Sequence, residues 1–205
     1  MLVPSMTLAE IKKEIDKDFP IVRNKGIYVQ RKLLHEYKPK GGETIVKYFD
    51  YVSKYKNNWI IRFGLNKKNT FSNHITYYYG DKGLLAIAPV DNGALLTFHT
   101  THFFKRFNER LNLNLTLPKD IIRKFMNEND RYEVHQLEEY SRGVFSIFVA
   151  ARNGYILGTH DKNLRIIRMN TFITFEMLKC DQRSVADKLN SEMKKYPYDP
   201  EKFNG

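Results

Sequence analysis

The chain has 205 residues, and its 34 Lys and Arg against 23 Asp and Glu give a formal charge of +11 with a pI near 9.6. Hydrophobic residues make up 42% of the chain and aromatic residues 14%, which is enough apolar material for a packed core and excludes a disordered basic tail. One cysteine, Cys180, excludes both an intramolecular disulfide and a zinc site made of several thiolates. No apolar run approaches the roughly 20 residues of a membrane span, so we expect no membrane partner and a cytoplasmic location.

The positive charge favours a polyanionic partner, which is RNA, DNA or an acidic protein. The alternative is a basic protein whose charge has no specific partner. Arginine is concentrated in the second half of the chain, with three residues in 1–97 and nine in 98–205. Because guanidinium groups form forked contacts with phosphate, we expect any phosphate site in that half.

The N-terminal part is predicted to be helical over residues 1–57. Thr7 and Glu10 have the spacing of a capping box, which predicts a helix from this point to about residue 18. Pro20 and Gly26 are expected to end it, with a second short helix over 27–37. Residues 38–42 indicate a turn or flexible joint, and the pattern of 43–55 predicts another helix.

From residue 58 the pattern changes to short β-favouring runs separated by Gly, Asn and Asp, so we expect a β-hairpin region over 58–98. The three tyrosines at 77–79 lie in one of these runs. They either form a surface on which RNA bases stack or belong to a strand with one buried ring. The predicted strands are 59–63, 75–79, 84–88 and 94–98.

Residues 99–205 are predicted to form an α+β unit with two helices, four strands and a last helix. Pro118 suits the first turn of the second helix. The expected fold class is therefore α+β, with a helical N-terminal segment and an antiparallel sheet packed with two helices. Whether the strands of 58–98 join this sheet or pair among themselves stays open. The predicted helices are 100–112 and 118–126, and the segment from 172 leads into a last helix that ends near 196. The predicted strands are 132–137, 144–150, 155–160 and 164–170.

The first of these helices contains the most informative pattern in the chain. At about 100° per residue, His102, Arg106 and Arg110 line one face of the helix. Glu109 joins this face, and so does His99 if the helix begins that early. The adjacent stripe is apolar and contains Phe103, Phe104, Phe107 and Leu111.

Two arginines on successive turns repel each other, so the stability of the helix does not require them. A bound phosphate would offset the repulsion, and a histidine beside it can exchange protons near neutral pH. The other interpretation is that carboxylates such as Glu109 satisfy Arg106 and Arg110 in surface ion pairs worth less than about 1 kcal/mol.

The order of a helix with H-x3-R-x3-R, a second helix and a run of strands resembles the barnase–EndoU–colicin–RelE-like ribonucleases and toxins. The resemblance is to an uncharacterised bacterial branch and covers residues 95–178. It is carried by the helix with His102, Arg106 and Arg110, by the second helix over 118–125, and by the last strand over 165–174. It implies a RelE-like or barnase-like unit over 99–205 that cleaves RNA in a toxin–antitoxin or phage-defence system, and hence an antitoxin or another protein partner.

Cleavage of RNA without a metal or cofactor needs a base for the ribose 2′-OH, cations for the transition state and an acid for the leaving oxygen. His102 is the candidate base or acid, and His160 is its possible partner. Arg106 and Arg110 would stabilise the negative charge of the transition state, and Arg168 or Arg165 would form a second contact with the phosphate. The candidate catalytic residues are therefore His102, Arg106, Arg110, His160 and Arg168. Candidates for substrate contact are His99, Glu109, Lys162, Arg165 and Thr171.

Two alternatives to a metal-independent ribonuclease remain. His99 and His102 have the spacing of metal ligands, but no H-E-x-x-H or paired-carboxylate motif accompanies them, and the neighbouring arginines would repel a dication. The other alternative is a binding module without catalysis, whose basic surface engages a nucleic acid or an acidic protein. His35, His74 and His135 stand alone and are expected to be ordinary surface or capping residues.

Overall fold

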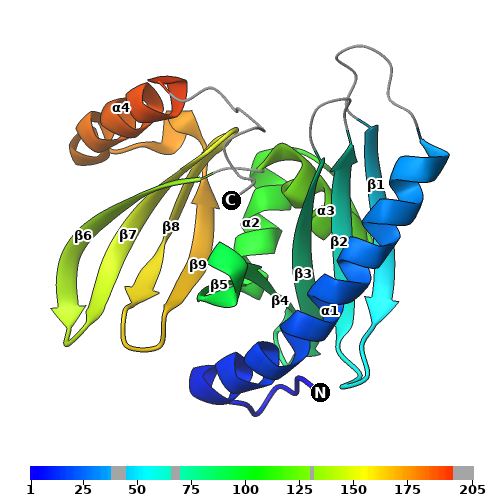
Figure 1. Ribbon diagram of the computed structural model, residues 1–205. Coiled ribbons are helices and arrows are strands. Elements are labelled where there is room, and N and C mark those ends of the chain that lie inside the picture. The colour runs from blue at the N-terminus through cyan, green and yellow to red at the C-terminus, as the bar shows by residue number, and fades with distance from the viewer. Residues whose placement is uncertain (38–44, 66–69, 130–131, 196–205) are drawn as a thin grey trace.

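A computed structural model of the chain describes residues 1–37, 45–65, 70–129 and 132–195 (Figure 1). The described residues form an α+β fold, as the sequence predicts. The four α-helices are α1 (Leu8–Glu36), α2 (Thr101–Arg110), α3 (Pro118–Glu128) and α4 (Cys180–Lys195). The strands are β1 (Ile45–Val52), β2 (Asn58–Leu65), β3 (Thr70–Gly80), β4 (Gly83–Val90), β5 (Leu95–His99), β6 (Glu133–Ser141), β7 (Val144–Ala151), β8 (Gly154–Asp161) and β9 (Ile166–Ile173). Short 3-10 helices occur at Asp91–Gly93 and Phe175–Met177.

The nine strands of the described residues belong to one sheet, in the order β1-β2-β3-β4-β5-β9-β8-β7-β6. Neighbouring strands are antiparallel except β5 and β9, which are parallel and pair Thr97 with Ile167. The sheet therefore consists of two antiparallel halves, β1–β5 and β6–β9, that meet at this single parallel pair. This answers the question left open by the sequence, because the strands of 58–98 join the C-terminal sheet.

The sheet curves around α2 and α3, which lie on its concave face between the two halves (Figure 1). Phe103, Phe107 and Phe125 from these helices form one core with residues of β2–β4 and β7–β9. Side chains alternate between the faces of a strand, so the other residues of the same strands point to the convex face. On that face α1 covers the half formed by β1–β5, and α4 packs on β7–β9.

The N-terminal helix is a single helix of 29 residues rather than two short ones. It begins with the predicted capping box of Thr7 and Glu10 and passes through Pro20 and Gly26. A proline inside a helix costs about 3 kcal/mol, and the burial of Ile11, Ile15, Phe19 and Val22 against the sheet offsets this cost. Gly26 allows α1 to approach β3, because a Cβ atom there would lie 2.8 Å from Nε2 of His74.

The predicted helix over 43–55 is wrong, since Ile45–Val52 form strand β1 and the segment 1–57 is not entirely helical. Its sequence, IVKYFDYV, is rich in β-branched and aromatic residues, which pack well on a pleated sheet. Pairing with β2 along its whole length decides the outcome. The predicted turn at 38–42 lies outside the described residues.

The structure makes two further predictions near aromatic residues more precise. The segment from 172 leads into the last helix only after the end of β9 and a 3-10 turn, so the helix itself begins at Cys180. The tyrosines at 77–79 form no common stacking surface: Tyr77 and Tyr78 are buried, and Tyr79 is 57% exposed. Tyr77 packs on the concave face and Tyr78 on the convex one.

Gly158 is required where β8 faces an irregularity in β9. A Cβ atom at this position would lie 2.1 Å from the carbonyl oxygen of Arg168, which is backbone and cannot move aside easily. We expect Gly158→Ala to lower the free energy of unfolding by about 1–3 kcal/mol, measured by urea denaturation. Thr159→Ala, at the next position of β8, is the control, and an equal effect of the two changes would contradict this role of Gly158.

Candidate functional site

Helix α2 begins at Thr101 because Thr100 caps it. The Thr100 hydroxyl accepts a hydrogen bond from the Phe103 N–H at 3.2 Å and donates one to the carbonyl of Asn170 in β9 at 3.0 Å. Thr101 donates to the carbonyl of Leu84 in β4 at 2.8 Å. The start of α2 is therefore tied to both halves of the sheet, and this fixes which face of the helix is outside.

The faces of α2 follow the spacing in the sequence. Phe103, Phe104 and Phe107 are buried in the concave core, whereas His102 is exposed and Arg106 half-buried. His102, Arg106 and Arg110 therefore lie outside the buried aromatic face of α2.

The two arginines of α2 differ in their partners. Arg106 forms an ion pair with Glu109 at 2.9 Å, and Lys105 approaches the same carboxylate at 3.9 Å. A guanidinium nitrogen of Arg110 donates to the carbonyl oxygen of Phe172 in β9. Burial and the like charge of Arg106 lower the pKa of Arg110, and Glu109 only partly opposes them. The ion-pair interpretation thus accounts for Arg106 but leaves Arg110 without a carboxylate among the described residues.

His99 is a core residue and cannot contact a substrate from solvent. It lies in β5, one residue before the helix cap, and is 1% exposed. Its ring packs against Phe103, Phe104 and Phe125, with centroid distances of 5.3, 5.6 and 5.1 Å. Burial lowers its pKa to about 4, which the nearby backbone of Ala86 opposes.

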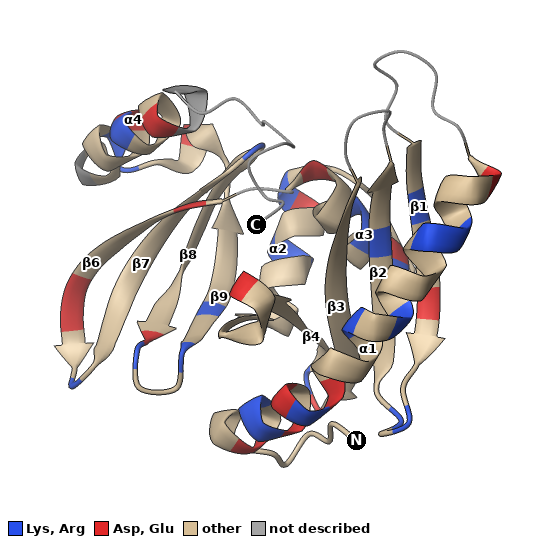
Figure 2. Ribbon diagram, in the orientation of Figure 1, with Lys and Arg blue, Asp and Glu red and all other residues tan. Residues whose placement is uncertain are grey.

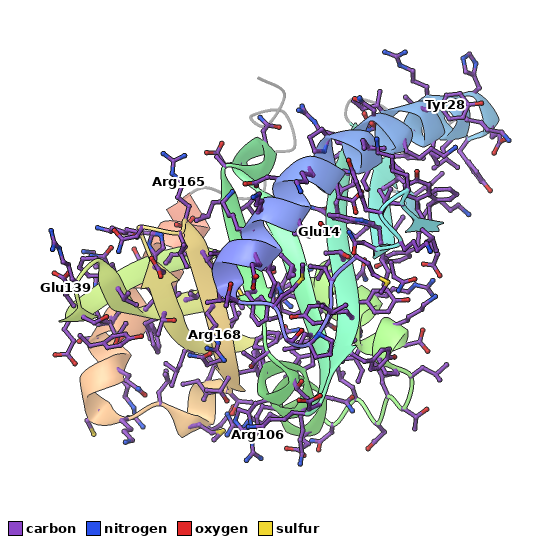
Figure 3. The ribbon with its side chains drawn as sticks, turned by 90° about the horizontal axis from the view of Figure 1, so that it is seen from below. Glu14, Tyr28, Arg106, Glu139, Arg165 and Arg168 are labelled. Atoms are coloured by element: carbon purple, nitrogen blue, oxygen red, sulfur yellow. The ribbon has the colours of Figure 1, made fainter. Side chains whose placement is uncertain are left out.

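Arg168 and Thr171 lie on the convex face of the sheet, away from α2. Ile167 and Met169 pack against α2 in the concave core, so the side chain of Arg168 points to the other face. Thr171 pairs with Leu157, which packs in the convex core under α4. Figure 3 places Arg106 and Arg165 at opposite edges of the molecule, with Arg168 between them. The structure does not bring Arg168 and His102 to one surface.

The remaining candidates surround the β8–β9 turn. His160 pairs with Ile167 and shares the concave face, whereas Arg165 is exposed in the turn. Lys162 lies over the ring of Phe145, 4.2 Å from its centroid. Burial and then the charge of Lys162 lower the pKa of His160, with Asp161 opposing.

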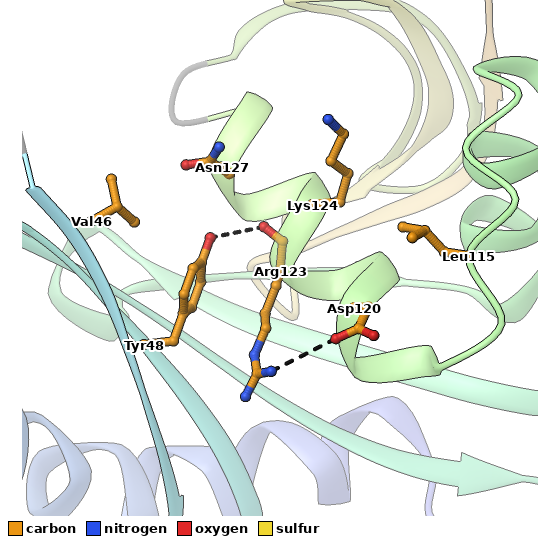
Figure 4. A pocket seen from close by; sticks show the side chains of 7 residues that line it. All are labelled: Val46, Tyr48, Leu115, Asp120, Arg123, Lys124 and Asn127. Carbon is orange, nitrogen blue, oxygen red and sulfur yellow. Dashed lines mark hydrogen bonds and ion pairs between the residues drawn. The ribbon is translucent and has the colours of Figure 1, made fainter.

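The structure also contains a shallow pocket of about 370 Å³ that the sequence did not indicate, between β1 and α3 (Figure 4). Tyr48 stands at its wall and donates a hydrogen bond to the backbone carbonyl of Arg123 at 3.0 Å. The predicted helix over 43–55 gives no indication of this pocket, because Tyr48 lies opposite Arg62 only when its segment pairs with β2 as a strand. The lining residues are Val46, Tyr48, Leu115, Asp120, Arg123, Lys124 and Asn127.

Asp50 lies beside the pocket and forms ion pairs with two residues of α3. Lys119 contacts its carboxylate at 3.0 Å and Arg123 at 2.9 Å. Partial burial raises the pKa of Asp50, but the hydrogen bonds from these two cations outweigh it and hold the pKa below its usual value. Asp50 thus neutralises part of the charge of α3.

Within the described part of the chain, no group of three or more His, Cys, Asp or Glu side chains is arranged to hold a metal ion. The helices described also include none that is long and apolar enough to cross a bilayer. No protein-family model, curated protein or solved structure matches the chain.

Proposed function

We propose that the protein binds RNA, with the outward polar face of α2 as the contact surface. The observation that supports this best is the excess of positive charge on the helix, where Lys105 and Arg106 share the carboxylate of Glu109 and Arg110 has no carboxylate partner among the described residues. Besides burial, the positive charge of Arg106 repels that of Arg110 and so lowers the pKa of Arg110. A phosphate that contacts both guanidinium groups relieves this repulsion and receives forked hydrogen bonds.

RNA is the partner that suits this surface because the cations stand on one ten-residue helix in a chain of charge +11. Their spacing along α2 matches successive contacts with a phosphate backbone, and the exposed His102 adds a further donor. RNA cleavage at this surface stays a prediction. His102 would supply one proton-transfer group, and His160, on the same face of the sheet, the other. An antitoxin or other protein partner also stays a prediction.

Replacing Arg106 by Gln tests the contact. We expect the affinity for a fluorescently labelled single-stranded RNA to fall roughly tenfold, because one charge-assisted contact contributes about 1.5 kcal/mol. The slope of log K against log salt should become about 0.7 smaller, since one fewer phosphate is neutralised. Fluorescence anisotropy between 50 and 200 mM salt measures both quantities.

Arg142→Gln is the matched control, because Arg142 is an exposed arginine in the turn between β6 and β7, far along the chain from α2. If wild type binds no RNA at 50 mM salt, or if both variants lose the same affinity, the proposed surface is wrong. The same samples report cleavage on a denaturing gel. Cleavage that His102→Ala abolishes without weakening binding would support the ribonuclease prediction.

A further inference from the structure

A second cationic group, distinct from the α2 surface, lies beneath the pocket between β1 and α3. Arg62 in β2 is 4% exposed, yet no carboxylate of the described residues lies within ion-pair distance of it. Its terminal nitrogens donate to the amide oxygens of Asn73 at 3.3 Å and Asn127 at 3.4 Å. Its Nε atom has no hydrogen-bond partner.

This environment leaves the charge of Arg62 poorly compensated. Charge-assisted hydrogen bonds to a carboxylate or phosphate are normally about 2.7–2.9 Å long, and both bonds of Arg62 exceed this. The effective cost of burying an ion is several kcal/mol unless a counter-ion and further hydrogen bonds offset it. The burial of Arg62 at this position therefore lowers the stability of the fold.

The surrounding residues hold the guanidinium group of Arg62 in position. The ring of Phe71 lies 4.9 Å from it in a cation–π contact. Gly64 makes room for this ring, because a Cβ atom there would lie 2.1 Å from ring atoms of Phe71. On the other side Tyr48 is the direct neighbour of Arg62 across β1 and β2.

The charge of Arg62 lies directly behind the wall of the pocket. Asn127 lines the pocket, is exposed, and accepts the hydrogen bond of 3.4 Å from Arg62, so a ligand must displace the Asn127 side chain to reach Arg62. Arg123 lies 5.7 Å from the ring of Tyr48 and also has an Nε atom without a partner. Burial raises the pKa of Tyr48, and this rise is opposed by the charge of Arg62, by a hydrogen bond from Arg62 and by the charge of Arg123. Two guanidinium groups therefore flank one phenol.

We propose that this pocket is a binding site for a small phosphate-bearing molecule, whose phosphate is held by Arg62 and Arg123. Arg62 has no carboxylate partner among the described residues, and its guanidinium fork suits a tetrahedral anion. Arg123 pairs with Asp50 at 2.9 Å and with Asp120 of the pocket wall at 3.7 Å, and a bound phosphate would take the place of Asp120. The volume of about 370 Å³ leaves room for a small organic group beside the phosphate, and this group stays largely exposed because the pocket is shallow. This site goes beyond RNA binding at α2 and does not depend on it.

Inorganic phosphate is the first probe, added to the full chain at constant ionic strength with chloride as the reference anion. We expect phosphate to raise the melting temperature of wild type in proportion to its saturation of the site. Arg62→Met should lose this increase. In chloride alone, Arg62→Met should melt at or above the wild-type temperature, because an apolar side chain replaces an uncompensated buried charge.

Two further variants keep the test independent of folding defects in Arg62→Met. Arg62→Lys retains the charge without the forked donors, and Arg123→Gln removes the second guanidinium, so both should at least halve the phosphate-induced shift. Arg106→Gln is the control on α2 and should keep the full shift even if it loses RNA binding. A short 5′-phosphorylated RNA that binds more tightly than its 5′-hydroxyl form, and only with Arg62 present, would identify an RNA end as the source of the phosphate.

The proposal is wrong if phosphate and chloride give the same melting temperature for wild type up to 50 mM. It is also wrong if the phosphate shift survives in Arg62→Lys and Arg123→Gln. If Arg106→Gln loses RNA binding and keeps the phosphate-induced shift in melting temperature, the result supports both sites separately. If wild type does not bind RNA but still shows the phosphate-induced shift, only the proposal for α2 is wrong.

Discussion

Replacing Asp18 by Ala should lower the free energy of unfolding by about 3–5 kcal/mol. Asp18 in α1 is completely buried. Its Oδ2 atom accepts hydrogen bonds at 2.7–2.9 Å from three side chains, which are Ser53, Asn57 and Trp59. These bonds join the first half of α1 to the β1–β2 connection and to β2. Alanine removes the acceptor of three buried donors, of which only Asn57 keeps another, the Glu14 carboxylate at 3.4 Å, and each unsatisfied group costs about 1–3 kcal/mol.

Urea denaturation of wild type, Asp18→Ala and Asp18→Asn measures this effect. The asparagine variant keeps one acceptor oxygen but loses the negative charge, so it should fall between the other two. Asp16→Ala is the matched control, because Asp16 is exposed on α1 and pairs only with Lys12, at 2.6 Å. A loss below about 1 kcal/mol for Asp18→Ala would contradict the central role of this carboxylate.

Acidification from pH 6.5 to pH 4 should destabilise the protein by about 3 kcal/mol for each of two buried histidines. Burial lowers the pKa of His74 and of His99 to about 4, and the charge of Arg23 adds to the effect at His74. In the unfolded chain both rings have a pKa near 6.5. The unfolded state therefore binds more protons throughout this window, so stability is full above pH 6.5 and falls as the pH decreases.

His99→Phe should remove about half of this pH dependence. Phenylalanine replaces the titratable ring by an apolar one among Phe103, Phe104 and Phe125 and removes two buried ring nitrogens. Thermal melts between pH 4.5 and 7.5 measure the dependence above the range in which most carboxylates titrate. His35→Gln, at the exposed end of α1, is the control and should retain the whole dependence. An unchanged slope in His99→Phe would contradict the assignment to His99.

The elements that the sequence predicts correctly are those with strong local signals. The capping box of Thr7, the proline at the first turn of α3 and the glycine-containing turns between strands all have their effect within a few residues. The polar and apolar faces of α2 follow from the helical period alone. This period predicts His102, Arg106 and Arg110 on one face of α2 without reference to any tertiary contact.

The elements that the sequence misses depend on tertiary contacts. The continuity of α1 through Pro20 comes from its packing on the sheet, and β1 is a strand because β2 pairs with it. His74 was expected at the surface, but α1 covers it through Gly26. The separation of Arg168 from α2 depends on which face of β9 is concave, and the curvature of the whole sheet decides this.

The two proposed cationic sites also differ in whether they depend on local sequence or on tertiary contacts. The excess charge of α2 can be counted in one stretch of ten residues, whereas Arg62 meets Tyr48 and Asn127 only in the folded chain. Figure 2 shows that Lys and Arg are spread over many elements of the ribbon rather than concentrated in one region. A net charge of +11 therefore does not identify a site, and the partners of each cation must be known.

The parallel pair of β5 and β9 also has a consequence for the order of folding. Every other pair of neighbouring strands is a hairpin that can form locally, but Thr97 and Ile167 are 70 positions apart in the chain. The entropy of closing this loop must be lost before the two halves of the sheet join. We therefore expect the halves to form first as separate units and to dock slowly, with the edges of β5 and β9 exposed to wrong pairing until they meet.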